Sequence, residues 1–234
     1  MVAKTSGNVS GADPRPGEIS LAHHGTLFLD ELPEWSRHAL EVLREPLESG
    51  SVSISRAARP CEFPARFQLV AAMNPCPCGW AGDPSGRCLC SDEAIRRYRG
   101  RISGPLLERI DLHVEVPRLP PTELRTDGLS GECSARVRER VLAARTRQYA
   151  RSGQTNARLD QAQTNAFCAL SPRDTALLER AVDALQLSAR SLHRILRVAR
   201  TIADLAGSDA IETPHLTEAI GYRKLERGSE RAAA

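Results

Sequence analysis

The sequence predicts an α/β domain with a parallel sheet, followed by an all-helical domain. Two short apolar segments, residues 26–29 and 67–73, have the composition of buried strands in a parallel sheet. The second half instead carries apolar residues at helical spacing. A Pro- and Gly-rich stretch at residues 117–131 separates the halves and is typical of a linker. We therefore expect three parts: an α/β core over residues 1–120, a linker and basic helix over 121–164, and a helical domain over 165–234.

The composition is that of a soluble protein. The chain has 234 residues, of which 41% are hydrophobic and 26% charged, enough to build one or two domains. No segment has the roughly 18 consecutive apolar residues of a membrane span, and the first residues lack the apolar stretch of a signal peptide. We therefore expect a cytoplasmic protein without a membrane partner. The net charge of +3 permits nucleic acid binding but does not argue for it.

The elements of the first half follow from local patterns. Residues 36–49 place Leu40, Leu43 and Leu47 on one helical face, and Gly50 ends this predicted helix. Alternating patterns, apolar runs and turn residues predict the secondary structure of the other segments. They are a loop at 1–18, strands at 26–29 and 51–55, a turn at 56–64, a strand at 67–73, a Cys-rich loop at 75–91, a helical stretch at 92–110 interrupted near Gly100 and Gly104, and a strand at 111–116.

The second half is predicted to contain four helices. A basic helix at 134–151 is followed, after a polar stretch, by helices at 171–185, 188–206 and 213–226. Ser171 and Thr213 are each followed by proline, the pattern of an N-cap hydroxyl and a proline in the first turn.

Three arginines share the polar face of the predicted helix 188–206. For Arg194 and Arg197 we expect an ordinary solvated basic face. Arg190 lies in the first turn, where the amino terminus of a helix favours anions, so it is the better phosphate candidate.

Polar side chains follow the two predicted parallel strands. Asp30 and Glu31 end the first strand, and Asn74 follows the second. Ligands of α/β sheets bind at the carboxyl edge, and an aspartate there helps to hold Mg²⁺ in P-loop NTPases while a neighbouring group orients the attacking water. The alternative is a strand followed by an acidic turn. Arg109, at a helix end, is placed to reach a phosphate of a neighbouring subunit, or else is a surface arginine.

Four cysteines form a candidate zinc site. Cys76, Cys78, Cys88 and Cys90 are spaced as C-x-C, nine residues, C-x-C, and four thiolates can hold Zn²⁺ tetrahedrally. Four protein ligands leave no open position, so the ion would staple the loop after Asn74 and would not be catalytic. The alternative is four reduced thiols in a packed loop.

Four motifs resemble those of one known family. They are PRPGEISLAHHG at residues 14–25, AAMNPCPCG at 71–79, RRYRG at 96–100 and VARTIADL at 198–205. They look like the signature of the Mg-chelatase-like AAA+ ATPases of the ComM/YifB family, and the similarity extends over about residues 14–227. This family is related to the magnesium chelatase motor subunit and more distantly to MCM helicases.

The resemblance implies a role for each candidate residue. Asp30 and Glu31 match the Walker B motif, with Asp30 near Mg²⁺ and Glu31 as the catalytic base. Asn74 matches sensor 1, and Arg109 matches the arginine finger that acts in trans. Arg190 matches the sensor 2 arginine of the helical lid domain. The implied fold is a partial AAA+ P-loop NTPase core followed by an all-α lid, with ATP and Mg²⁺ as cofactors.

The resemblance also implies a partner. Residues 51–67 match the hairpin before sensor 1, which faces the pore and touches DNA in related helicases; Arg56 and Arg59 are its candidates here. ComM-type proteins are hexameric motors that promote DNA branch migration during natural transformation. The resemblance therefore implies a homo-oligomeric ring that acts on DNA.

The sequence departs from the family at one decisive point. No segment matches the Walker A loop G-x-x-x-x-G-K-[ST], although Lys4-Thr5 mimics its last two residues. That loop cradles the phosphates, so we expect no tight Mg-ATP binding and no hydrolysis by this chain alone, and an apolar sheet face without cover. A truncated chain, a split or mis-started gene and a degenerate subunit all remain open. So do two other functions: a non-hydrolysing partner in an AAA+ ring and a magnesium chelatase-type motor subunit.

Overall fold

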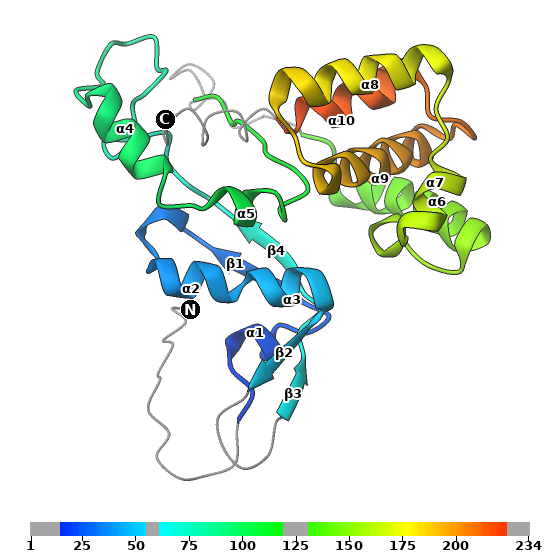
Figure 1. The fold of residues 1–234 in the computed structure, drawn as a ribbon, viewed down its shortest axis with the longest axis horizontal. Coiled ribbons are helices and arrows are strands. Elements are labelled where there is room, and N and C mark those ends of the chain that lie inside the picture. Colours follow the sequence, from blue (N-terminus) through cyan, green and yellow to red (C-terminus); the bar gives the residue numbers. More distant parts are fainter. Residues whose placement is uncertain (1–14, 55–60, 119–130, 224–234) are drawn as a thin grey trace. The chain divides into compact units, whose positions relative to one another are not determined.

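The computed structural model describes residues 15–54, 61–118 and 131–223, which Figure 1 draws in colour. The chain divides into two compact units, the first ending at Ile110 and the second beginning at Asp111. The first unit is mixed α/β and the second is helical, which confirms the predicted fold class. Within the described part of the chain, no helix combines the length and apolarity needed to cross a membrane.

A two-stranded parallel sheet organises the first unit. Strand β1 (Thr26–Leu29) pairs in parallel with β4 (Gln68–Ala71), as predicted, and Phe28 lies opposite Val70. Strands β2 (Ser51–Ile54) and β3 (Cys61–Pro64) form an antiparallel pair. The helices are α1 (Glu18–Leu21), a 3₁₀ turn (Leu32–Glu34), α2 (Arg37–Val42), α3 (Arg44–Ser49), α4 (Asp92–Arg99) and α5 (Gly104–Leu107).

The apolar core of the first unit lies on one side of this sheet. Its buried members come from β1, from helices α2 and α5 and from the segments beside them: Leu29, Leu32, Leu40, Leu43, Ile102, Leu106 and Leu107. On the sheet, Phe28 is 58% exposed and Val70 is 40% exposed, although the two side chains are register partners. An apolar patch of the sheet thus faces solvent in this chain, as expected from the sequence.

The predicted helix over 36–49 is interrupted. It forms as α2 and α3, which meet at Leu43. Pro46 accounts for the break, because proline lacks an N–H to donate to the carbonyl of Val42 and its ring clashes with that carbonyl in a continuous helix. Gly50 ends α3 in the left-handed conformation, as predicted.

Two strand predictions need correction. The segment 111–116 alternates like a strand but pairs with no strand among the described residues. Instead, the backbone N–H of His113 donates to the carbonyl of Tyr222 (2.9 Å), and His113 is the buried member of the alternation while Leu112 and Val114 are exposed. Within the predicted turn over 56–64, residues 61–64 form strand β3.

The second unit is a helical assembly around one apolar core. Its helices are α6 (Ser134–Ser152), a 3₁₀ turn (Asn156–Arg158), α7 (Gln161–Phe167), α8 (Pro172–Leu185), α9 (Ala189–Ala206) and α10 (Thr213–Gly221). The amphipathic helix α9 contributes Ile195, Leu196, Ala199 and Ala203 to the core. Helix α7 was not predicted, and it begins with a capping box between Asp160 and Gln163.

Of the two predicted N-cap residues in this unit, one caps its helix as predicted and the other does not. The Ser171 side chain caps α8 by accepting from the N–H of Asp174 (3.1 Å), as predicted. For α10 the N-cap is Glu212, one residue before Thr213, and it forms a capping box with His215. The Thr213 hydroxyl instead donates to the Asp174 carboxylate (2.6 Å), which joins the starts of the two helices.

Candidate nucleotide site

The parallel pairing of β1 and β4 brings the predicted acidic and amide residues to one edge of the sheet. Both strands run toward this edge, where Asp30 and Glu31 follow β1 and Asn74 follows β4. The strand ends are tied by two backbone hydrogen bonds, from the N–H of Ala72 to Leu29 and from the N–H of Leu32 to Ala72, each 2.9 Å. The carboxyl edge of a parallel sheet is where ligands bind in α/β folds, and three exposed polar side chains gather there.

The acidic turn has an unusual backbone. Glu31 adopts the left-handed conformation (φ 50°), which for a residue other than glycine costs about 1–3 kcal/mol. Its N–H donates to the Asp30 carboxylate (2.9 Å), and the indole N–H of Trp35 donates to the Asp30 carbonyl (2.9 Å). These bonds hold the Asp30 carboxylate and the backbone of the turn at the end of β1. Strain of this kind is concentrated at functional sites, and the turn combines it with two exposed carboxylates at the carboxyl edge of the sheet.

Helix α4 supports the end of β4. Its buried Tyr98 bonds to the backbone of Asn74, and burial raises the pKa of the Tyr98 phenol, with the charges of Glu34 and Glu31 adding to the shift. The guanidinium of Arg99 donates to the carbonyl of Pro75 (3.0 Å). Both residues belong to the RRYRG motif, whose sequence alone does not indicate this role. Their contacts fix the backbone that carries Asn74.

Arg109 is buried and paired within its own unit. It is 8% exposed, and its guanidinium binds the Glu48 carboxylate, with Nη2–Oε2 at 2.5 Å and Nε–Oε2 at 3.2 Å. A third bond runs from Nη1 to the carbonyl of Pro105 (2.6 Å). The alternative of a surface arginine is therefore wrong. A role in trans would require this side chain to leave Glu48.

The three arginines of α9 differ in environment. Arg190 is exposed in the first turn of α9, where the phosphate hypothesis placed it. Arg194 is 8% exposed and binds Asp111 (2.5 Å), and Arg197 donates to the carbonyl of Ala157 (3.1 Å). The predicted solvated basic face is therefore wrong for Arg194 and Arg197. Both hold neighbouring segments against α9.

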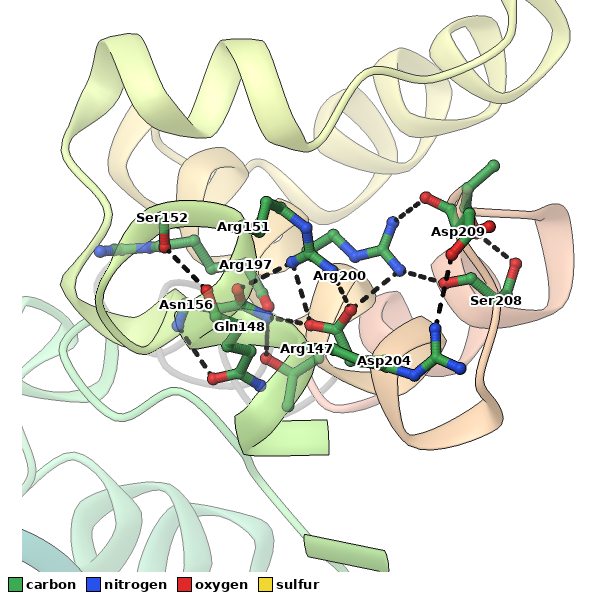
Figure 2. A network of polar contacts seen from close by, with 12 residues as sticks. Arg147, Gln148, Arg151, Ser152, Asn156, Arg197, Arg200, Asp204, Ser208 and Asp209 are labelled. Carbon is green, nitrogen blue, oxygen red and sulfur yellow. Dashed lines mark hydrogen bonds and ion pairs between the residues drawn. The ribbon is translucent and has the colours of Figure 1, made fainter. Parts of the chain in front are cut away.

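A buried ionic network joins α6 to α9, as Figure 2 shows. Its centre is Asp204, whose side chain is fully buried and accepts from Arg151, from Arg200 (3.1 Å) and from the Asn156 amide (2.8 Å). Arg200 is 1% exposed and also donates to the carbonyl of Ser208 (2.5 Å). This network could not be predicted from the sequence, because burial of Arg200 and Asp204 depends on how the helices pack and not on a local pattern.

The four predicted zinc ligands lie together. The Sγ atoms of Cys76, Cys78, Cys88 and Cys90 all lie within 4.8 Å of one another. The backbone N–H of Trp80 is the main cause that lowers the pKa of Cys78 to about 6. The arrangement is that of a cluster, rather than of isolated thiols.

The predicted DNA contacts belong to the hairpin of β2 and β3. β2 and β3 pair antiparallel, with Ile54 opposite Cys61, so the chain reverses between them. Arg56 and Arg59 lie outside the described residues.

Comparisons with known proteins give consistent matches. Residues 3–124 match the family described as magnesium chelatase, subunit ChlI, and residues 131–223 match the C-terminal family of the same subunit. Over 217 residues, 93% of the chain, the sequence is 52% identical to competence protein ComM of Haemophilus influenzae and 50% identical to the uncharacterized protein YifB of Escherichia coli. It is 26% identical over 110 residues, 47% of the chain, to magnesium-chelatase subunit ChlI of Porphyra purpurea, of which it covers 25%. The chain spans 42% of the length of ComM and of YifB.

Proposed function

The chain belongs to the magnesium chelatase ChlI family, in the group of AAA+ ATPases that contains ComM and YifB, and from this membership we propose that it works as part of an ATP-driven motor on DNA. The motor would be a hexameric ring in the cytoplasm that promotes branch migration during natural transformation. The observation that carries the ATPase part is the gathering of Asp30, Glu31 and Asn74 at one carboxyl edge. The identity to a protein named for competence supports the DNA part.

Each residue of the site has a distinct part in this proposal. Asp30 supplies a carboxylate for Mg²⁺, the oxygen ligand that this ion prefers, and Glu31 takes the proton of the attacking water. Asn74 orients that water or the γ-phosphate. Arg190 contributes positive charge from the helical lid, and Arg109 does so toward a neighbouring subunit after release from Glu48. Bound Mg-ATP supplies the phosphoryl group whose transfer to water drives the motor.

A second candidate function is that of a non-hydrolysing ring partner. The 234 residues contain no G-x-x-x-x-G-K-[ST] segment, the loop whose backbone N–H groups cradle the phosphates in P-loop NTPases. A chain of this kind can still occupy a position in an AAA+ ring and donate Arg109 to a neighbour while hydrolysing no ATP. A chelatase-type motor is the weaker alternative, since identity is 52% to ComM and 26% to ChlI.

A fusion protein tests the proposal. The part of Haemophilus influenzae ComM that the match leaves uncovered is joined to this chain, and ATP hydrolysis is measured with and without branched DNA. We expect hydrolysis that DNA stimulates. A soluble fusion that binds ATP but never hydrolyses it would leave the non-hydrolysing ring partner as the better account.

The unfused chain is the matched control. We expect no heat of Mg-ATP binding in isothermal titration at millimolar ATP, with Glu31→Gln used to prevent turnover. The physical reason is that carboxylates and one amide give the triphosphate few favourable contacts without the amide cradle and lysine of a P-loop. Clear binding would show that another segment replaces the P-loop.

The hairpin assignment leads to a separate prediction on DNA. Arg56→Ala with Arg59→Ala in the fusion protein is expected to weaken binding to branched DNA and to lower the slope of log K against log salt concentration by about 2, since each phosphate contact contributes about 0.9. The matched control is Arg136→Ala with Arg138→Ala, which removes two exposed arginines of α6 and the same charge. Equal losses in both double variants would reject the hairpin as the DNA contact.

A further inference from the structure

Four sulfur atoms from two C-x-C segments converge on one point of the first unit. Cys76 Sγ lies 3.4 Å from Cys78 Sγ and 3.8 Å from Cys88 Sγ, and the Cys78 and Cys88 sulfurs are 3.7 Å apart. Cys90 completes the group, with all four sulfurs within 4.8 Å of one another. All four cysteines are free, and these separations are far longer than the roughly 2.05 Å of a disulfide bond.

These separations fit a tetrahedral metal centre. Zinc–sulfur bonds of about 2.3 Å place the sulfur atoms of a tetrahedron about 3.8 Å apart. The three measured edges of 3.4, 3.8 and 3.7 Å lie close to that value. We propose that Cys76, Cys78, Cys88 and Cys90 bind one zinc ion as a structural site.

The surrounding backbone is arranged around these sulfurs. The N–H of Ala81 donates to the Sγ of Cys76 (3.3 Å), and the N–H of Gly79 donates to the Cys76 carbonyl (3.0 Å). Gly79 has a φ of 78°, a conformation that glycine adopts without a steric penalty and that allows the tight turn directly after Cys78. N–H donors to a metal-bound thiolate orient it and spread its negative charge. The loop thus carries the outer contacts that such a site requires.

The site ties together the two ends of a loop. Cys76 follows Asn74 by two residues, and Cys90 precedes the start of α4 at Asp92 by two residues, with Ser91 as the N-cap. Four protein ligands leave no position for substrate, so the ion is structural and not catalytic. Its effect is to fix the backbone on which Asn74 depends.

Metal analysis of the whole chain tests the proposal directly. The 234-residue chain is purified under reducing conditions without added metal and examined by elemental mass spectrometry. We expect about one zinc per chain, and less than a tenth of that in the variant with all four cysteines changed to serine. The matched control is Cys133→Ser, an exposed cysteine far along the chain from the cluster, which should keep its zinc. Iron in place of zinc, or equal zinc in the four-serine variant, would overturn the assignment.

Two further measurements on the unaltered chain guard against a variant that fails to fold. Cobalt added to the metal-free chain is expected to give the intense thiolate-to-cobalt absorption of a tetrahedral four-sulfur site. Chelation of zinc is expected to speed hydrogen exchange in residues 75–91 and leave exchange in α9 unchanged, because α9 belongs to the other unit. Cobalt without such absorption, or identical exchange with and without zinc, would show four packed thiols and no metal site.

Discussion

Asp204→Ala is expected to lower the free energy of unfolding of the helical unit by about 3–5 kcal/mol, the usual loss when one partner of a buried ion pair is removed. The Asp204 side chain is fully buried between Arg151 and Arg200, and the side chain of Arg200 is 2% exposed. Without the carboxylate, two guanidinium groups lose their counter-charge, and the Asn156 amide loses an acceptor. The unit therefore loses the ion pair between Arg151 of α6 and Asp204 of α9.

Asp209→Ala is the matched control for this prediction. Asp209 lies five residues away and pairs with Arg147 at 3.4 Å, but its side chain is fully exposed. Exposed pairs contribute little, so no measurable change is expected. Urea unfolding followed by circular dichroism, together with hydrogen exchange of α9 amides, measures both variants. A similar loss of unfolding free energy in both variants would mean that burial does not determine how much Asp204 contributes to stability.

Glu31→Gln is expected to reduce ATP hydrolysis by the fusion protein by about 10²-fold to 10⁴-fold, the usual contribution of a general base. The amide keeps the size of the side chain but cannot take a proton from water. ATP binding should persist, so a fall in the maximal rate without loss of affinity is the expected signature. Rates and nucleotide affinity are measured on the same preparation.

Two companion variants separate catalysis from structure at this turn. Glu34→Gln removes an exposed carboxylate that pairs with Arg101 at 2.9 Å, and it should leave the rate within about twofold, since surface pairs contribute little. Glu31→Gly also removes the base, but glycine adopts the left-handed backbone without the cost of about 1–3 kcal/mol that other residues incur there. A loss of activity without a loss of stability in Glu31→Gly would support a functional origin of the strain. An unchanged rate in Glu31→Gln would remove Glu31 from the mechanism.

Local patterns in the sequence were enough to predict much of the fold. The apolar runs that became β1 and β4 predicted buried strands of a parallel sheet; the parallel pairing is confirmed, but the burial is wrong for Phe28 and Val70, which are exposed. The periodicity of residues 188–206 predicted α9 and its core face. The leucine spacing predicts one continuous helix over residues 36–49, whereas Pro46 is the residue that signals the break between α2 and α3.

Other features depend on contacts that no local pattern shows. The alternation of segment 111–116 predicts an extended chain, but a strand also needs a partner, and here a single backbone bond to Tyr222 takes that place. Likewise, the polar face of α9 predicts that the Arg194 side chain is exposed, whereas it is buried and forms an ion pair with Asp111. Both errors arise from residues distant in the sequence. For the candidate site, the strand ends predicted Asp30, Glu31 and Asn74 together, but the support of Asn74 by Tyr98 could not be predicted.

The closeness of the four cysteines also has a consequence for redox chemistry. Thiols separated by 3.4–3.8 Å need only small movements to form disulfides once an oxidant removes two hydrogens from a pair. Four cysteines allow three different pairings, so air oxidation would yield a mixture of cross-linked loops rather than one product. A metal ion bound to all four sulfurs would shield them from this reaction. The history of exposure to oxygen will therefore decide whether a preparation of this chain is homogeneous around Asn74.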